Sequence, residues 1–124
     1  MGFMRHHAIL VTTYDFEKVG LAYGQAVKVF QSDSVSLDST KITPADMVTP
    51  ILQSPVNGYY TFAIFPDGSK EGWSESEAGN AMRATFLRYL DGQRYADGSS
   101  PLKWAEVQYG DDNHETLIVR HSDE

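Results

Sequence analysis

The run Ala8–Thr13, with the sequence AILVTT, is apolar and β-branched almost without a break. A short continuous run of this kind is typical of a strand buried on both faces, so we expect it at the centre of a sheet. Asp15 follows as a helix N-cap, and after it apolar residues recur with the 3.6-residue period of one buried helix face. The apolar positions of this expected helix are Phe16, Val19, Tyr23, Ala26, Val27 and Phe30.

The middle of the chain predicts a hairpin. Met47–Leu52 has the composition of a second strand, and Pro50 confines that strand to an edge or a bulge. Asn57 and Gly58 predict a type I′ turn, because both central positions of that turn need positive φ. The partner strand is Tyr59–Phe65, with aromatic side chains on both of its faces.

The last third predicts a helix and a closing hairpin. Ser74–Glu77 has the pattern of a capping box and opens the helix. Its expected buried stripe is Ala78, Met82, Thr85, Phe86, Tyr89 and Leu90. Arg83 and Arg88 are then left to solvent or to a partner. Lys103–Tyr109 and Thr116–His121 form the closing hairpin.

The expected order is β-α-β-β-α-β-β over a single α+β domain, residues 1–124. We predict a two-layer sandwich in which two helices cover one face of a mainly antiparallel sheet, a ferredoxin-like order with an extra strand. Gln31–Asp46 is a long connection with no sustained period. Because this fold supports many unrelated functions, the fold alone assigns none.

Composition narrows the functional classes. The 124 residues contain no cysteine, which excludes disulfides, zinc ribbons and thiolate nucleophiles. The net charge of −7 opposes non-specific binding to nucleic acid and to membrane surfaces. It suits either a soluble protein or one that meets a basic partner. The start of the chain lacks a signal-peptide pattern and no apolar run could span a bilayer, so we expect a cytoplasmic protein.

Basic residues flank the first and last expected strands. Arg5, His6 and His7 precede the first strand, and Arg120 and His121 end the last. If these strand ends meet in one sheet, they form a cationic pocket that suits phosphate or carboxylate. The alternative is a pair of solvated termini. His6 and His7 point to opposite faces of a strand, so they do not share one metal ion, and we expect no metal and no cofactor.

Three further residues are candidates for ligand binding. Lys70 lies in a glycine-containing loop before a helix start, where backbone N–H groups bind anions, although the Walker spacing is missing. A plain structural turn is the alternative. Trp73 packs near Ala78 as a hydrophobic staple or provides a stacking surface, and Tyr59 is a second stacking candidate.

Neither the acidic loop near the end of the chain nor the serine residues match a known metal-binding or catalytic pattern. Asp111, Asp112, His114 and Glu115 offer metal-ligating atoms in one loop but lack the calcium-loop spacing, so a solvated acidic loop is the expectation. No serine lies in a nucleophile-elbow pattern. The doubly aromatic strand Tyr59–Phe65 needs cover on its second face, which either a second subunit or core packing provides, and we expect a homo-oligomer.

Three segments resemble a group of small, uncharacterised proteins carried by bacteria and their phages. They are the start RHHA at Arg5–Ala8, VQYGDD at Val107–Asp112 and IVRHSD at Ile118–Asp123. The resemblance covers about half the chain, including Pro66–Trp73, and does not extend to Gln31–Asp46. It implies no activity, and it favours an accessory or anti-defence protein over a housekeeping enzyme.

Together these observations predict a non-enzymatic binding protein, a phage-type anti-defence protein that sequesters a small anionic, nucleotide-like ligand. The expected ligand-binding residues are Arg5, His6, His7, Tyr59, Lys70, Trp73, Arg120 and His121. The first alternative is an acidic inhibitor of a protein partner, and the second is a small hydrolase. No nucleic-acid polymer or membrane is an expected partner.

Overall fold

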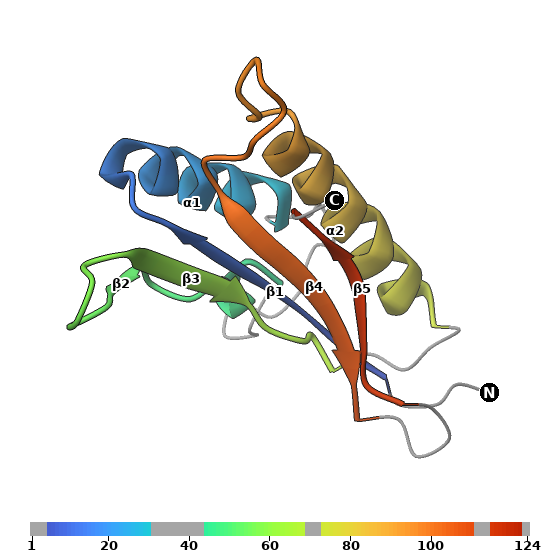
Figure 1. The fold of residues 1–124 in the computed structure, drawn as a ribbon. Coiled ribbons are helices and arrows are strands. Elements are labelled where there is room, and N and C mark those ends of the chain that lie inside the picture. The colour runs from blue at the N-terminus through green and yellow to red at the C-terminus, as the bar shows by residue number, and fades with distance from the viewer. Residues whose placement is uncertain (1–4, 31–43, 69–72, 111–114, 123–124) are drawn as a thin grey trace.

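The structure is a computed structural model that describes residues 5–30, 44–68, 73–110 and 115–122. Along the chain the elements are β1 (His6–Thr13), α1 (Phe16–Phe30), the 3-10 helix η1 (Pro44–Met47), β2 (Leu52–Gln53), β3 (Tyr60–Ile64), α2 (Ser74–Asp91), β4 (Lys103–Tyr109) and β5 (Leu117–His121). The strands form one antiparallel sheet in the spatial order β2-β3-β1-β4-β5. Figure 1 shows β1 crossing the middle of that sheet.

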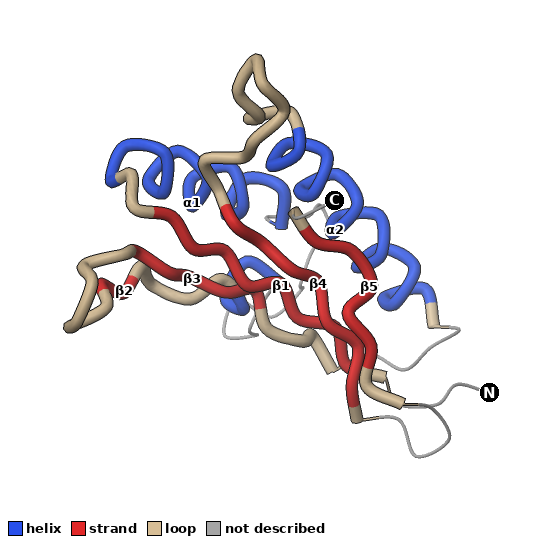
Figure 2. Tube along the Cα trace, in the orientation of Figure 1, coloured by secondary structure: helices blue, strands red, loops and turns tan. Residues whose placement is uncertain are grey.

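Both helices cover the same face of the sheet, as Figure 2 shows. This arrangement confirms the predicted α+β sandwich and the central position of the first strand. We call the helix side of the sheet the covered face and its opposite side the open face. In the described ranges, neither helix has the length and hydropathy needed to cross a membrane.

Helix α1 begins where the sequence predicts. The carboxylate of Asp15 accepts a hydrogen bond from the backbone N–H of Lys18 at 3.0 Å, which confirms the N-cap. Its buried face consists of Val19, Ala22, Ala26 and Phe30. Phe16 does not belong to that face, because its ring is 72% exposed and packs against Tyr60 at the rim of the sheet, with 5.4 Å between ring centroids.

Helix α2 begins one residue earlier than its capping-box pattern predicts. The N-cap is Trp73, whose backbone is extended (φ −79°, ψ 153°) and whose side chain makes no capping bond. The backbone N–H of Glu77 donates to the carbonyl of Trp73 at 3.1 Å, the first bond of the helix. An N-cap residue must be non-helical, and Ser74 is already helical. The predicted role of Ser74 as the cap is therefore wrong.

The buried stripe of α2 also differs from the prediction. The buried positions are Ser76, Gly79, Arg83, Phe86, Leu87 and Leu90. Ala78 and Thr85, which we expected inside, are exposed. Arg83, which we expected outside, is only 6% exposed: its Nη2 donates to the Asn80 side chain, and its Nε lies 3.6 Å from the buried Glu106 carboxylate on β4. Gly79 leaves room for that side chain, since a Cβ there would lie 3.2 Å from the Arg83 guanidinium.

The first hairpin has a longer turn than predicted. Ser54 and Tyr59 close it with an N–H to carbonyl bond of 2.7 Å, and Gly58 donates back to Ser54 at 3.0 Å. Gly58 has φ +74°, but no described non-glycine residue has positive φ, so Asn57 does not form a type I′ turn. Instead the Asn57 side chain accepts the Tyr59 N–H at 2.9 Å, the local bond that asparagine favours in turns.

The predicted bounds are less accurate for the edge strand β2 than for the closing hairpin. The strand expected at 47–52 is reduced to β2, which lies at the edge of the sheet after Pro50. Because proline has no N–H to donate, it interrupts the pairing there. In contrast, β4 and β5 form the predicted closing hairpin, with a register shift between Glu106 and Val107.

Candidate functional site

A buried carboxylate organises the covered face beside α2. Glu106 on β4 is 3% exposed and pairs in register with Arg120 on β5. The Arg120 guanidinium donates to Oε1 of Glu106 through Nε at 2.8 Å and lies 2.6 Å from the same oxygen through Nη2. Charge-assisted bonds of this kind are the strong ones, so Arg120 is fixed in place by the sheet itself.

Two further groups approach the other carboxylate oxygen. Nε of Arg83 lies 3.6 Å from Oε2 of Glu106, and Nδ1 of His7 lies 3.9 Å from it. Both side chains are buried. We call Glu106, Arg120, Arg83 and His7 the Glu106 cluster. It joins β1, β4, β5 and α2, and it explains why an arginine occupies the inner face of a helix, because a buried carboxylate needs compensating charge.

An open cavity of about 860 Å³ lies next to this cluster, between the last turns of α2 and the strands β4 and β5. Three arginines line it: Arg88 on α2, Arg94 in the loop after α2, and Arg120 on β5. His121 and Asp91 are the other titratable residues of its lining. The apolar part of the wall comes from Leu87, Trp104 and Val119.

Arg94 holds one wall of the cavity in place. Its guanidinium donates to Asp91 at 2.7 Å, to the carbonyl of Gly98 at 3.0 Å and to the carbonyl of Ser122 at 3.3 Å. These bonds tie the α2–β4 loop to the end of β5. The wall is therefore built from segments far apart in the sequence, and its shape depends on the packing of the whole sheet.

Trp104 on β4 lies in the wall of the same site and has a buried indole N–H. The residue is 8% exposed and lines the cavity, and its indole Nε1 has no hydrogen-bond partner among the described residues. Buried indole N–H groups normally have a partner, so this donor stands out.

The structure brings part of the predicted site together. Arg120 and His121 line the cavity. His7 lies near Arg120, and Glu106 stands between them. The ends of the first and last strands therefore do share a cluster of basic groups, but a buried carboxylate neutralises part of their charge.

Arg5 and His6 lie away from the cavity, towards the start of β1. His6 pairs with Tyr109, and its ring lies 5.4 Å from the Tyr109 ring. Arg120 is level with Ile9, since both neighbour Glu106. At about 3.3 Å per residue, Arg5 is about 13 Å from that level along the strand. Neither Arg5 nor His6 is among the residues that line the cavity.

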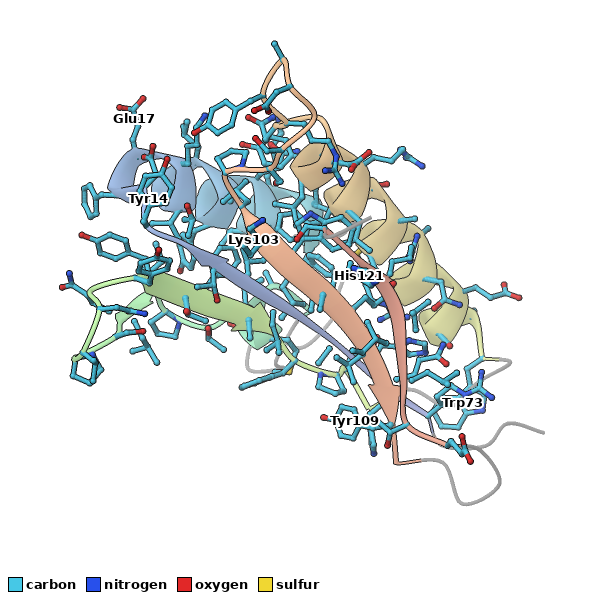
Figure 3. The ribbon with its side chains drawn as sticks, viewed as in Figure 1. Tyr14, Glu17, Trp73, Lys103, Tyr109 and His121 are labelled. Atoms are coloured by element: carbon cyan, nitrogen blue, oxygen red, sulfur yellow. The ribbon has the colours of Figure 1, made fainter. Side chains whose placement is uncertain are left out.

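The aromatic candidates lie at opposite ends of the molecule. Figure 3 places Trp73 at the start of α2 and Tyr14 at the far end of the sheet, well away from it. Tyr59 belongs to the Tyr14 end, with 6.3 Å between the two ring centroids. The cavity therefore takes its aromatic wall from Trp104 instead of Tyr59 or Trp73.

Some predicted residues fall outside the described ranges. These are Lys70, Asp111, Asp112 and His114, whereas Glu115 is described and exposed. The described part of the chain contains no group of three His, Cys, Asp or Glu side chains that could hold a metal ion.

Sequence reasoning missed four residues of this region: Arg88, Arg94, Trp104 and Glu106. One signal was available, because alternation along β4 places Trp104 and Glu106 on the same face as the core. A glutamate at an inward position of a strand indicates a buried charge that needs a partner. No local signal identified Arg83 as that partner.

Comparisons with known proteins do not assign this site. No protein-family model matches the sequence, and neither a curated protein nor a solved structure matches it significantly.

Proposed function

We propose that the protein is a non-enzymatic binding protein that holds a small anionic, nucleotide-like ligand in the cavity between α2, β4 and β5. The observation that carries the proposal is the composition of the cavity wall: Arg94 is paired with Asp91 and Arg120 with the buried Glu106, so Arg88 supplies an excess positive charge. The chain as a whole has a net charge of −7, so this is a local reversal of sign.

The arginines suit a phosphate or a carboxylate. A guanidinium presents a planar fork of donors that matches both groups, and Arg94 and Arg120 are already held by hydrogen bonds. Arg88 is exposed, and its Nη2 donates to the hydroxyl of the neighbouring Thr85 at 3.3 Å. It is therefore the arginine with most freedom to turn towards a ligand.

The remaining wall suits an organic ligand larger than an inorganic ion. A volume of about 860 Å³ lies within the range of cavities that bind small organic molecules. Leu87 and Val119 offer apolar contact, and Trp104 offers an aromatic side chain. An anionic group with an attached heterocycle, as in a nucleotide, would use all three kinds of contact.

Binding fits the wall better than covalent catalysis. The described residues that line the cavity include no Ser, Thr or Cys to act as a nucleophile. Sequestration of a nucleotide-like signal would suit an anti-defence role, and that part of the proposal rests on the resemblance of both ends of the chain to small bacterial and phage proteins.

Isothermal titration with nucleoside mono-, di- and cyclic phosphates tests the proposal. Arg88→Ala should weaken binding by about 1.5–3 kcal/mol, roughly tenfold to more than a hundredfold, and the loss should shrink as salt rises. Lys28→Ala removes the same charge from the exposed side of α1 and should leave affinity nearly unchanged. Arg5→Ala tests whether the ligand binds at the start of β1 instead; if it binds in this cavity, Arg5→Ala should leave affinity nearly unchanged.

Two outcomes would contradict the proposal. If none of the panel binds at millimolar concentration and native mass spectrometry shows no retained ligand, the cavity is not an anion site and an acidic protein inhibitor becomes the better proposal. If Arg5→Ala weakens binding as much as Arg88→Ala does, the ligand lies elsewhere on the sheet.

A further inference from the structure

The open face of the sheet has no cover in the described part of the chain, and its side chains are mostly apolar. Leu10 stands at its centre and is 45% exposed, although it belongs to the central strand. Phe65, Leu52 and Ile118, towards its margins, are more exposed still. A contiguous apolar surface on one side of a sheet usually marks an interface.

The charges of this face limit what can cover it. Alternation along the strands assigns no Asp or Glu of the described strands to the open face, although the chain contains 17 acidic residues. By the same alternation its basic residues are Lys103, His6 and His121, and His121 is in register with Ala105. A basic partner would find no complementary charge here, whereas two copies of this acidic chain could meet here without opposing carboxylates.

The centre of the face is shaped to receive a copy of itself. The register places Ala63 on one side of Leu10 and Ala105 on the other. The leucine side chain therefore projects further from the sheet than the two short alanine side chains beside it. In a two-fold contact each leucine can lie over an alanine of the other copy, which is the self-complementarity that an isologous interface needs.

The polar groups of the face are compatible with burial. The hydroxyls of Thr12 and Thr61 bond to each other at 3.0 Å across neighbouring strands. The backbone groups of β1 are paired on both sides by β3 and β4. Covering this region would therefore leave few polar groups without a partner, which is the main cost of burying a surface.

The area of the open face is near the lower limit for a specific contact. The strands have 8, 2, 5, 7 and 5 residues, and at about 3.3 Å per residue and 4.8 Å between strands their flat projection is about 430 Å². Projecting side chains such as Ile118, at 64% exposure, raise the accessible area above that projection. A specific interface buries at least about 1,000 Å² in total, which is about 500 Å² on each partner.

We propose that the open face is the interface of a homodimer, in which two sheets stack face to face about a two-fold axis near Leu10. Stacked sheets lie about 10 Å apart, a spacing that leucine and alanine side chains fill. The helices of each copy then form the two outer layers. The cavity beside α2 lies on the covered face, so it would remain open in both copies.

Sedimentation equilibrium and light scattering on the full chain test this proposal. As its concentration is raised to about 0.1 mM, wild-type protein should reach twice the chain mass of 13.8 kDa. Leu10→Asp should yield a monomer with an unchanged circular-dichroism spectrum, because it places two like charges at the centre of the contact. Leu21→Asp is the matched control, since Leu21 is 58% exposed on α1, and it should remain a dimer.

Three results decide against the proposal. A wild-type monomer throughout that concentration range overturns it, and so does a folded Leu10→Asp variant that keeps the dimer mass, because the contact then uses another surface. If Leu10→Asp does not fold, Ile118→Asp at the exposed edge replaces it, with monomer as the expected result. A dimeric Ile118→Asp variant would then also count against the open face.

Discussion

The two faces of this sheet reverse the usual distribution of charge. The covered face carries the Glu106 cluster, in which Glu106, Arg83 and His7 are buried, and the cavity lies beside that cluster. The open face has an apolar centre, where Leu10 is 45% exposed and its neighbours in register are the buried Ala63 and the half-buried Ala105. Exposure alone therefore does not predict where this protein places its charged residues.

The difference lies in which groups each face can bring together. Helix α2 packs against the covered face, so Arg83 on α2 lies close to the Glu106 carboxylate on β4. Such a cluster needs all its members, because a buried charge without compensation is costly. The open face has no second layer of its own among the described elements, and its apolar residues are suited to contact with another sheet. One face is specialised for polar contacts within the chain, and the other for contacts between chains.

The largest expected effect comes from the Glu106 cluster. Glu106→Gln keeps the shape but removes the charge that faces Arg83, His7 and Arg120, so we expect a loss of about 3–5 kcal/mol in the free energy of unfolding. Urea denaturation measures it. Glu115→Gln, on an exposed glutamate, should change stability by less than about 0.5 kcal/mol. Equal effects of the two variants would show that the cluster is no more important than a surface charge.

Substitutions of Ile9 and Leu10, which are adjacent on β1 and point to opposite faces, allow the two faces to be compared directly. Ile9 is fully buried on the covered face, and Ile9→Ala should cost about 2–5 kcal/mol at every protein concentration. Leu10→Ala should cost less at low concentration and progressively more as concentration rises, because mass action couples folding to dimerisation. Thermal melts over a hundredfold dilution series distinguish the two. A Leu10→Ala effect that is independent of concentration would contradict a role for Leu10 in association.

The two helices that form the outer layer should respond differently at their N-termini. Asp15→Ala removes an observed cap bond to Lys18 and should cost about 1 kcal/mol. Ser74→Ala should cost less than about 0.5 kcal/mol, because Trp73 and not Ser74 is the N-cap of α2. Chemical denaturation of the two variants side by side gives the comparison. A larger loss for Ser74→Ala would show that the serine caps the helix in solution.

The smallest expected effect lies in the α2–β4 loop beside the cavity. The Ser99 hydroxyl and N–H donate to Asp97 at 2.6 Å and 2.9 Å, and these bonds lower the pKa of Asp97 below its ordinary 3.8. The stability they contribute is complete above that ordinary value and is lost as pH falls through the lower folded-state pKa. In Ser99→Ala, carboxyl NMR titration should show the pKa of Asp97 rising back towards 3.8. An unchanged titration would exclude the hydroxyl as the cause.

Several elements follow from local sequence alone. The run Ala8–Thr13 predicts the central strand, and Asp15 predicts the start of α1. The closing hairpin was predicted almost to the residue at β4 and β5. In each case the signal is a propensity, a cap or an apolar period that lies within a few residues of the feature it specifies, so it can be recognised without knowledge of the fold.

The functional region depends instead on pairs that are distant in the chain. The pairing register of β1, β4 and β5 sets Arg120 beside Glu106 and leaves Arg5 further along the sheet, and no local pattern specifies that offset. The inward rotation of Arg83 follows from the same cause, because an apolar period assigns an arginine to solvent unless its buried partner is already known. Local sequence thus defined the strands and helices, whereas long-range pairing decided which charges are buried together, since burial energy depends on partners that only packing brings within reach.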